Sequence, residues 1–91
     1  MDRWVRSVKI DCDVYKGLEK EDYYLYVNSE DGLSRVPQAL QDRFGGLEKT
    51  LSFELTRDRR LAREDAAVVY ENLIEQGYHL QLPPADGRFR E

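Results

Sequence analysis

The stretch Gln76-Gly77-Tyr78-His79-Leu80-Gln81-Leu82-Pro83-Pro84 decides the fold of this chain. A helical pattern ends at Gly77, a typical C-terminal cap, and an alternating strand follows it. This strand places Tyr78, Leu80 and Leu82 on one face and turns His79 outward. Pro83 has no N–H to give to a ladder, so we expect pairing to end there and the strand to lie at a sheet edge.

The helix that leads into this stretch is predicted to start near Ala62. Glu64 and Asp65 precede its apolar stripe, where negative charges stabilise the positive end of a helix. The spacing of the apolar residues predicts that one face of the helix packs into the core. The residues of that face are Ala66, Val69, Tyr70, Leu73 and Ile74.

Two strands are predicted near the start of the chain, and we expect them to form an antiparallel hairpin. Ser7 to Tyr15 alternates with a period of two, so that Val8, Ile10, Cys12 and Val14 point inward and Lys9, Asp11 and Asp13 point outward. Tyr23 to Val27 is rich in strand-favouring residues. It places Tyr23, Leu25 and Val27 on one face and Tyr24 and Tyr26 on the other.

The middle of the chain predicts a short helix and a third strand. Pro37 occupies a first helical position, Phe44 ends the helix and Gly45-Gly46 closes it. The strand Leu47 to Leu55 then alternates, with an apolar face of Leu47, Lys49, Leu51, Phe53 and Leu55 and an exposed face of Glu48, Thr50, Ser52 and Glu54. The element order is therefore β-β-α-β-α-β, an α+β fold.

Composition limits the classes of protein this chain can represent. The 91 residues are 41% hydrophobic and 35% charged, which is typical of one folded domain, and we assign residues 1–91 to it, with a core of about 7–84 and a polar tail of 85–91. The formal net charge of -4 repels polyanions and anionic membranes. A single cysteine and a charged start without a signal-peptide pattern predict a cytoplasmic protein without a membrane span.

Several segments resemble the YcgL family of small gammaproteobacterial proteins. They are Tyr24-Leu25-Tyr26-Val27, Ser34-Arg35-Val36-Pro37, Leu61-Ala62-Arg63-Glu64-Asp65 and the closing stretch from Gln76 to Pro84, so the resemblance spans roughly Cys12 to Pro84. It implies an α/β/α sandwich and a family with no assigned biochemical role. Because two strands carry a charged face, we expect the second helix layer to be partial.

No catalytic residues, cofactor or metal site emerge from the sequence. His79 stands alone as the only histidine, Cys12 belongs to an inward apolar pattern, and Gly45-Gly46 follows a helix instead of opening one, so each has an ordinary structural interpretation. An enzyme is therefore not expected. The candidate binding surface consists of Tyr24, Tyr26, Arg57, Arg59, Arg60, Arg63 and His79.

Two function classes remain open. The first is a non-catalytic module that binds an unidentified protein partner. The second is an RNA-associated accessory factor that uses the arginine cluster together with Tyr24 and Tyr26, joined by Tyr15. The net charge of -4 repels a polyanion, and only the four clustered arginines could neutralise phosphates. We therefore expect any nucleic-acid binding to be weak and salt-sensitive. The more ordinary interpretation places both tyrosines beneath the helix Pro37 to Phe44.

Overall fold

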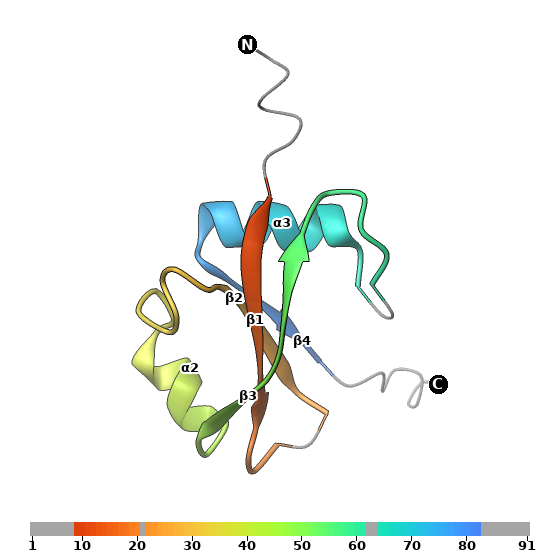
Figure 1. The fold of residues 1–91 in the computed structure, drawn as a ribbon. Helices are drawn as coiled ribbons and strands as arrows, with labels where there is room; N and C mark the ends of the chain where they lie inside the picture. The colour runs from red at the N-terminus through yellow and green to blue at the C-terminus, as the bar shows by residue number, and fades with distance from the viewer. Residues whose placement is uncertain (1–8, 21, 62–63, 83–91) are drawn as a thin grey trace, which may run out of the picture.

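The structure is a computed structural model that describes residues 9–20, 22–61 and 64–82. Within these ranges the elements are β1 (Ile10–Gly17), β2 (Tyr24–Asn28), α2 (Gln38–Arg43), β3 (Leu47–Leu55), α3 (Ala66–Glu75) and β4 (Tyr78–Gln81) (Figure 1). The predicted order β-β-α-β-α-β and the α+β class are confirmed. Val8 and Arg63 lie outside the described residues.

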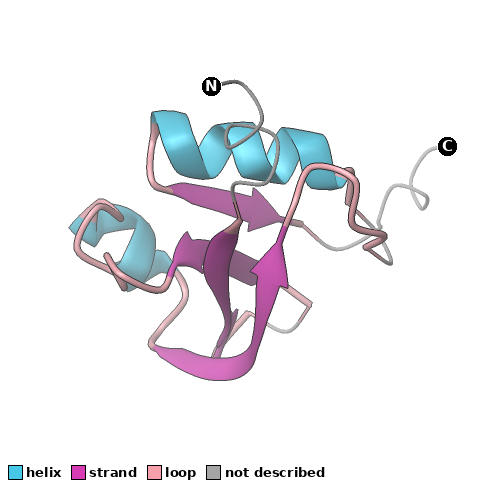
Figure 2. Ribbon diagram, turned by 45° about the horizontal axis from the view of Figure 1, so that its top comes forward, coloured by secondary structure: helices cyan, strands magenta, loops and turns pink. Residues whose placement is uncertain are grey.

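The four strands form one antiparallel sheet in the order β3-β1-β2-β4. The predicted hairpin of the first two strands is confirmed, with Val14 opposite Tyr26. The prediction that the last strand lies at a sheet edge is also confirmed, because β4 pairs with β2 and ends the order. The two helices lie well apart from each other around this sheet (Figure 2).

Each face of the sheet carries its own apolar core. On one face α3 packs over residues of β1, β2 and β3, and the buried set is Ile10, Cys12, Val14, Tyr26, Leu55, Ala66, Val69, Tyr70 and Leu73. On the other face the segment around α2 encloses Leu25, Val27, Val36 and Phe44. The expected α/β/α arrangement follows from these two cores.

Strand pairing corrects the expected position of the tyrosines. Tyr24 and Tyr26 were expected beneath α2, but both pack with the α3 core. Residues directly opposite each other in a sheet share a face. Tyr26 pairs with Val14, which is buried in the α3 core, so Tyr26 also faces α3. Tyr15 pairs with Leu25 and packs in the α2 core, so it does not join the other two tyrosines.

A bulge in β3 changes the face that its side chains occupy. Val14 pairs with Leu51 and Tyr15 pairs with Lys49, which leaves Thr50 as an extra residue in the strand. Leu47 consequently packs in the α2 core, whereas Phe53 packs with the α3 core. The expectation of one continuous apolar face from Leu47 to Leu55 was therefore wrong.

Helix α3 has the predicted C-terminal cap and most of the predicted stripe, and Asp65, predicted only as a favourable charge, is its N-cap. The Asp65 side chain accepts a hydrogen bond from the Ala67 N–H at 3.0 Å, and Gly77 closes the helix at a φ of 92°. The helix begins at Ala66, later than the sequence predicts. Ile74 is 53% exposed, a correction that arises because it lies furthest from the centre of the buried stripe at 100° per residue.

Helix α2 is short and covers only part of its face. Its limits agree with the prediction to within one residue, with Pro37 before it and Gly45-Gly46 after it at φ values of 67° and 112°. None of its own residues is buried. The expectation of a partial second layer is consistent with this, since Ser52 and Glu54, opposite Asp13 and Asp11 on this face of the sheet, remain exposed.

Candidate binding groove

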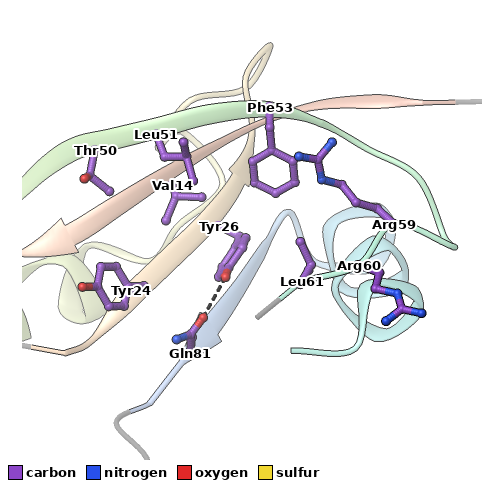
Figure 3. Close-up of a pocket in the computed structure, with 10 residues that line it drawn as sticks. All are labelled: Val14, Tyr24, Tyr26, Thr50, Leu51, Phe53, Arg59, Arg60, Leu61 and Gln81. Carbon is purple, nitrogen blue, oxygen red and sulfur yellow. Dashed lines mark hydrogen bonds between the residues drawn. The ribbon is translucent and has the colours of Figure 1, made fainter. Parts of the chain in front are cut away.

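An open groove lies on the α3 face of the sheet, beside the part that the helix covers (Figure 3). Its volume is about 560 Å³. The lining comes from all four strands and from the segment between β3 and α3. It consists of Val14, Tyr24, Tyr26, Thr50, Leu51, Phe53, Arg59, Arg60, Leu61 and Gln81. Among these, Leu51 is 55% exposed, so apolar surface of the groove is in contact with solvent.

Tyr26 is fixed at the base of the groove. Its hydroxyl donates a hydrogen bond to the side-chain carbonyl of Gln81 at 2.7 Å (Figure 3). Its ring meets the rings of Phe53 and His79 edge to face, with centroid distances of 6.5 Å and 5.7 Å. Tyr24 is less buried and lies further along the same face. Of the two candidate tyrosines, Tyr24 therefore offers the more accessible surface.

Two arginines of the candidate surface line the groove. The Arg59 guanidinium lies 4.6 Å above the centroid of the Phe53 ring, and its Nη1 donates to the Glu54 carbonyl oxygen at 3.1 Å. These contacts hold the charged group beside the aromatic floor. Arg60 is exposed and lines the same groove.

Arg57, a third arginine of the predicted cluster, is used elsewhere. It forms an ion pair with Glu71 and lies 4.7 Å above the centroid of the Tyr70 ring. Since it does not line the groove, the predicted arginine cluster is divided between α3 and the groove. Arg63 lies outside the described residues.

His79 corrects the sequence interpretation most directly. It was expected to face outward, but it is buried because its partner in the sheet, Tyr26, faces α3. Its Nδ1 lies 2.9 Å from the Asn72 amide nitrogen and its Nε2 lies 2.7 Å from Glu64 Oε1. An amide N–H donor requires Nδ1 to accept, so Nε2 carries the proton that the Glu64 carboxylate accepts. Here His79 joins β4 to α3.

Cys12 lies in the centre of the α3 core with no exposed surface. Burial, reinforced by the neighbouring Asp13 charge, raises the pKa of its thiol to about 12. The thiolate is the reactive form of cysteine, so this environment suppresses its chemistry. The predicted inward orientation of Cys12 is confirmed.

Sequence reasoning missed a polar cluster on the other face, centred on Asp13. This carboxylate was expected to be exposed but is buried, and the Ser29 and Ser52 hydroxyls both donate to its Oδ1 at 2.7 Å. Lys49 Nζ lies 3.4 Å from the other carboxylate oxygen. Burial favours a higher pKa for Asp13, but the two hydroxyls and the Lys49 charge outweigh it, and the pKa lies below its ordinary value.

Part of the groove was also missed. Tyr24, Tyr26, Arg59 and Arg60 were candidates, whereas Phe53, Leu61 and Gln81 were not. The alternation of β4 contained a signal for Gln81, since it shares a face with His79. Nothing in the sequence indicated how far α3 would cover the sheet.

Over the described ranges, no group of three or more His, Cys, Asp or Glu side chains is placed to hold a metal ion. Over the same ranges, no helix combines the length and apolar character needed to cross a membrane.

A four-stranded antiparallel sheet between two helical segments, with an open groove on one face, defines the chain as a small α/β/α domain. The chain belongs to the YcgL domain family, whose model matches residues 12–84. This confirms the family resemblance seen in the sequence.

Relatives in bacteria cover most of the chain. A YcgL domain-containing protein of Pseudomonas fluorescens strain SBW25 is 48% identical over 80 residues, which is 88% of this chain and 82% of the relative. A protein of the same description from Pseudomonas aeruginosa strain LESB58 has the same identity and coverage. One from Stutzerimonas stutzeri strain A1501 is 44% identical over 84 residues, or 92% of this chain and 87% of the relative. These descriptions name a domain and no activity.

Proposed function

We propose that the chain is a non-catalytic, cytoplasmic module that binds another protein through the groove on its α3 face. The observation that carries this proposal is the partial cover of the sheet by α3, which leaves Leu51 exposed beside Tyr24 and Phe53. Grooves with an apolar floor and a few fixed polar groups are typical of binding sites. Gln81 and Arg59 are the polar groups here, each held by a contact within the fold.

A non-enzymatic role fits the state of the reactive side chains. His79 is buried between Asn72 and Glu64, and Cys12 is enclosed in the core. Neither lines the groove. General acid-base or nucleophilic chemistry needs such a group within reach of a bound substrate.

Site-specific photo-crosslinking tests this proposal. A benzophenone amino acid at position 51 would place the crosslinker in the groove, and the same residue at position 74 would place it on the outer face of α3. Leu51 and Ile74 are matched in exposure, at 55% and 53%. In bacterial cells that produce the chain, we expect a discrete protein adduct from position 51 and none from position 74. Equal adducts from both positions, or none from position 51, would refute the proposal.

RNA binding is the second candidate, favoured by the presence of Tyr24, Arg59 and Arg60 in one groove. Two observations weigh against it. The Tyr26 ring is enclosed edge to face by its neighbours, and the Arg59 guanidinium already covers a face of Phe53. Bases stack on open aromatic faces, so the groove offers a smaller platform than its composition suggests.

Fluorescence anisotropy with a short labelled single-stranded RNA distinguishes the two candidates. Contacts from Arg59 and Arg60 alone would give a slope of about -1.4 in log affinity against log salt, at about 0.7 per phosphate. We expect weak binding at low salt that disappears at physiological salt. Submicromolar affinity at physiological salt, lost in Tyr24→Ala, would favour RNA over protein.

A further inference from the structure

We propose that the groove selects a partner segment in which an apolar side chain is followed closely by a carboxylate, and that Arg59 binds this carboxylate. The proposal rests on the proposed protein-binding function and adds the chemistry of the partner. It follows from the distribution of charge around the groove, from the way Arg59 is held and from the exposed leucine on the floor.

The charge of the groove is opposite to that of the chain. The sequence contains 18 acidic and 14 basic side chains, yet among the described residues the groove is lined by two arginines and by no acidic residue. Coulomb energy falls with distance and salt screens it further, so a bound ligand interacts most strongly with the arginines that line the groove. The groove therefore favours a ligand with a local negative charge.

Arg59 is already in position to receive a carboxylate. Its stacking on Phe53 and its hydrogen bond to the Glu54 carbonyl fix the plane of the guanidinium. A guanidinium carries five N–H donors in a planar fork that matches a carboxylate, and the Glu54 contact is made through Nη1. Because the side chain is ordered before binding, the ligand loses less affinity to ordering it.

The floor supplies the second part of the recognition. Leu51 and Val14 are opposite each other in the sheet, and Leu61 lines the same groove from the segment that carries both arginines. An apolar side chain bound here would lie beside Phe53, and its neighbour in the ligand would reach Arg59 (Figure 3). A peptide that alternates apolar and acidic residues satisfies both requirements.

Selection from a random peptide library displayed on phage, with the full chain as target, tests this chemistry. We expect the selected peptides to share an apolar residue with Asp or Glu within two positions of it. A labelled synthetic copy of the most frequent peptide is then titrated against the variants by fluorescence anisotropy. Arg59→Ala should weaken binding about ten- to hundredfold, as expected for a lost hydrogen bond to a charged group.

Two further variants and two controls separate the roles of charge, fork geometry and floor. Arg59→Lys keeps the charge but loses the planar fork, so it should restore only part of the affinity. Leu51→Ser should also weaken binding. Arg57→Ala and Ile74→Ser are matched controls outside the groove, and they should change the affinity for the peptide by no more than about twofold.

The outcomes distinguish this inference from the proposed function. Selected peptides that need Leu51 but contain no acidic residue, or that bind equally well to Arg59→Ala, would overturn the inference and leave the protein-binding groove in place. Peptides unaffected by Leu51→Ser, or a library that yields no binder, would overturn the proposed function as well.

Discussion

Both faces of the sheet are covered only in part, and the uncovered parts are built differently. On the α2 face, Asp13 lies in the sheet centre and is satisfied by Ser29, Ser52 and Lys49. On the α3 face, the uncovered part is apolar, bordered by Arg59 and Arg60, and hollowed into a groove. The uncovered part around Asp13 is completed by internal polar contacts, whereas the uncovered part of the α3 face presents the apolar side chain of Leu51 to solvent.

This difference indicates which open surface is available for binding. A buried carboxylate with two hydroxyl donors and an ammonium group has its hydrogen-bonding capacity met within the fold. The side chain of Leu51 is apolar and 55% exposed, so contact with another molecule would remove its surface from water. The proposed binding site therefore lies on the α3 face.

The strongest test of a sealed α3 core is the reactivity of Cys12. This residue is the only cysteine, has no exposed surface and has a thiol pKa raised to about 12. Its labelling by a thiol reagent at neutral pH should be slower in the native protein than in denaturant by about a thousandfold or more, since reaction requires opening of the core. Comparable rates in the two states would show that the covered half of this face is open as well.

The contribution of α3 to stability is the next largest effect. Leu73 is 1% exposed on the core-facing side of α3, and Leu73→Ala should lower the free energy of unfolding by about 2 to 5 kcal/mol through lost burial and a cavity. Val68 faces solvent on the same helix, and Val68→Ala should have a much smaller effect. Urea unfolding followed by circular dichroism measures both. Equal losses would contradict the orientation of the helix described above.

The sequence predicted the elements better than it predicted the faces they share. Alternation in β1 and helical spacing in α3 are local properties, and Cys12, Val69 and Leu73 lie where those patterns place them. His79 and Asp13 were assigned to the wrong environment because their burial depends on polar partners distant in sequence, Glu64 and Ser52. A pattern of apolar residues carries no information about such partners.

The groove was predictable only in part for a related reason. Tyr24 and Arg59 were visible as surface candidates, but their position in one groove depends on strand pairing and on the extent of α3. The bulge at Thr50 moves the side chains of half of β3 to the opposite face of the sheet. The alternation of apolar residues in the sequence continues unbroken through this point, so it does not reveal the change of face. The fold class could therefore be predicted from the sequence, whereas the residues of the groove could be identified only once the pairing register of the strands was known.

The polar contacts of Asp13 on the α2 face predict that the stability of the fold depends on pH in the acid range. The pKa of Asp13 is lower in the folded protein than its ordinary value of 3.8, so its contribution is full above that pH and is lost as the pH falls through the folded pKa. Asp13→Asn should lower the free energy of unfolding at neutral pH by about 1 to 3 kcal/mol. The variant should also lose less stability than wild type between neutral and acid pH. Parallel pH profiles in urea unfolding would show that Asp13 does not stabilise this face.

The smallest expected change in stability is that of a groove residue, and it is compared with that of a core residue on the same strand, β3. Leu55 is fully buried beneath α3, whereas Leu51 on the same strand is 55% exposed in the groove. Leu55→Ala should cost about 2 to 5 kcal/mol, and Leu51→Ala should change the free energy of unfolding by less than about 0.5 kcal/mol. A leucine that does not stabilise the fold yet lines a groove is expected at a binding surface. A large loss of stability in Leu51→Ala would mean that this residue supports the fold, and it would remove the main argument for binding at this face.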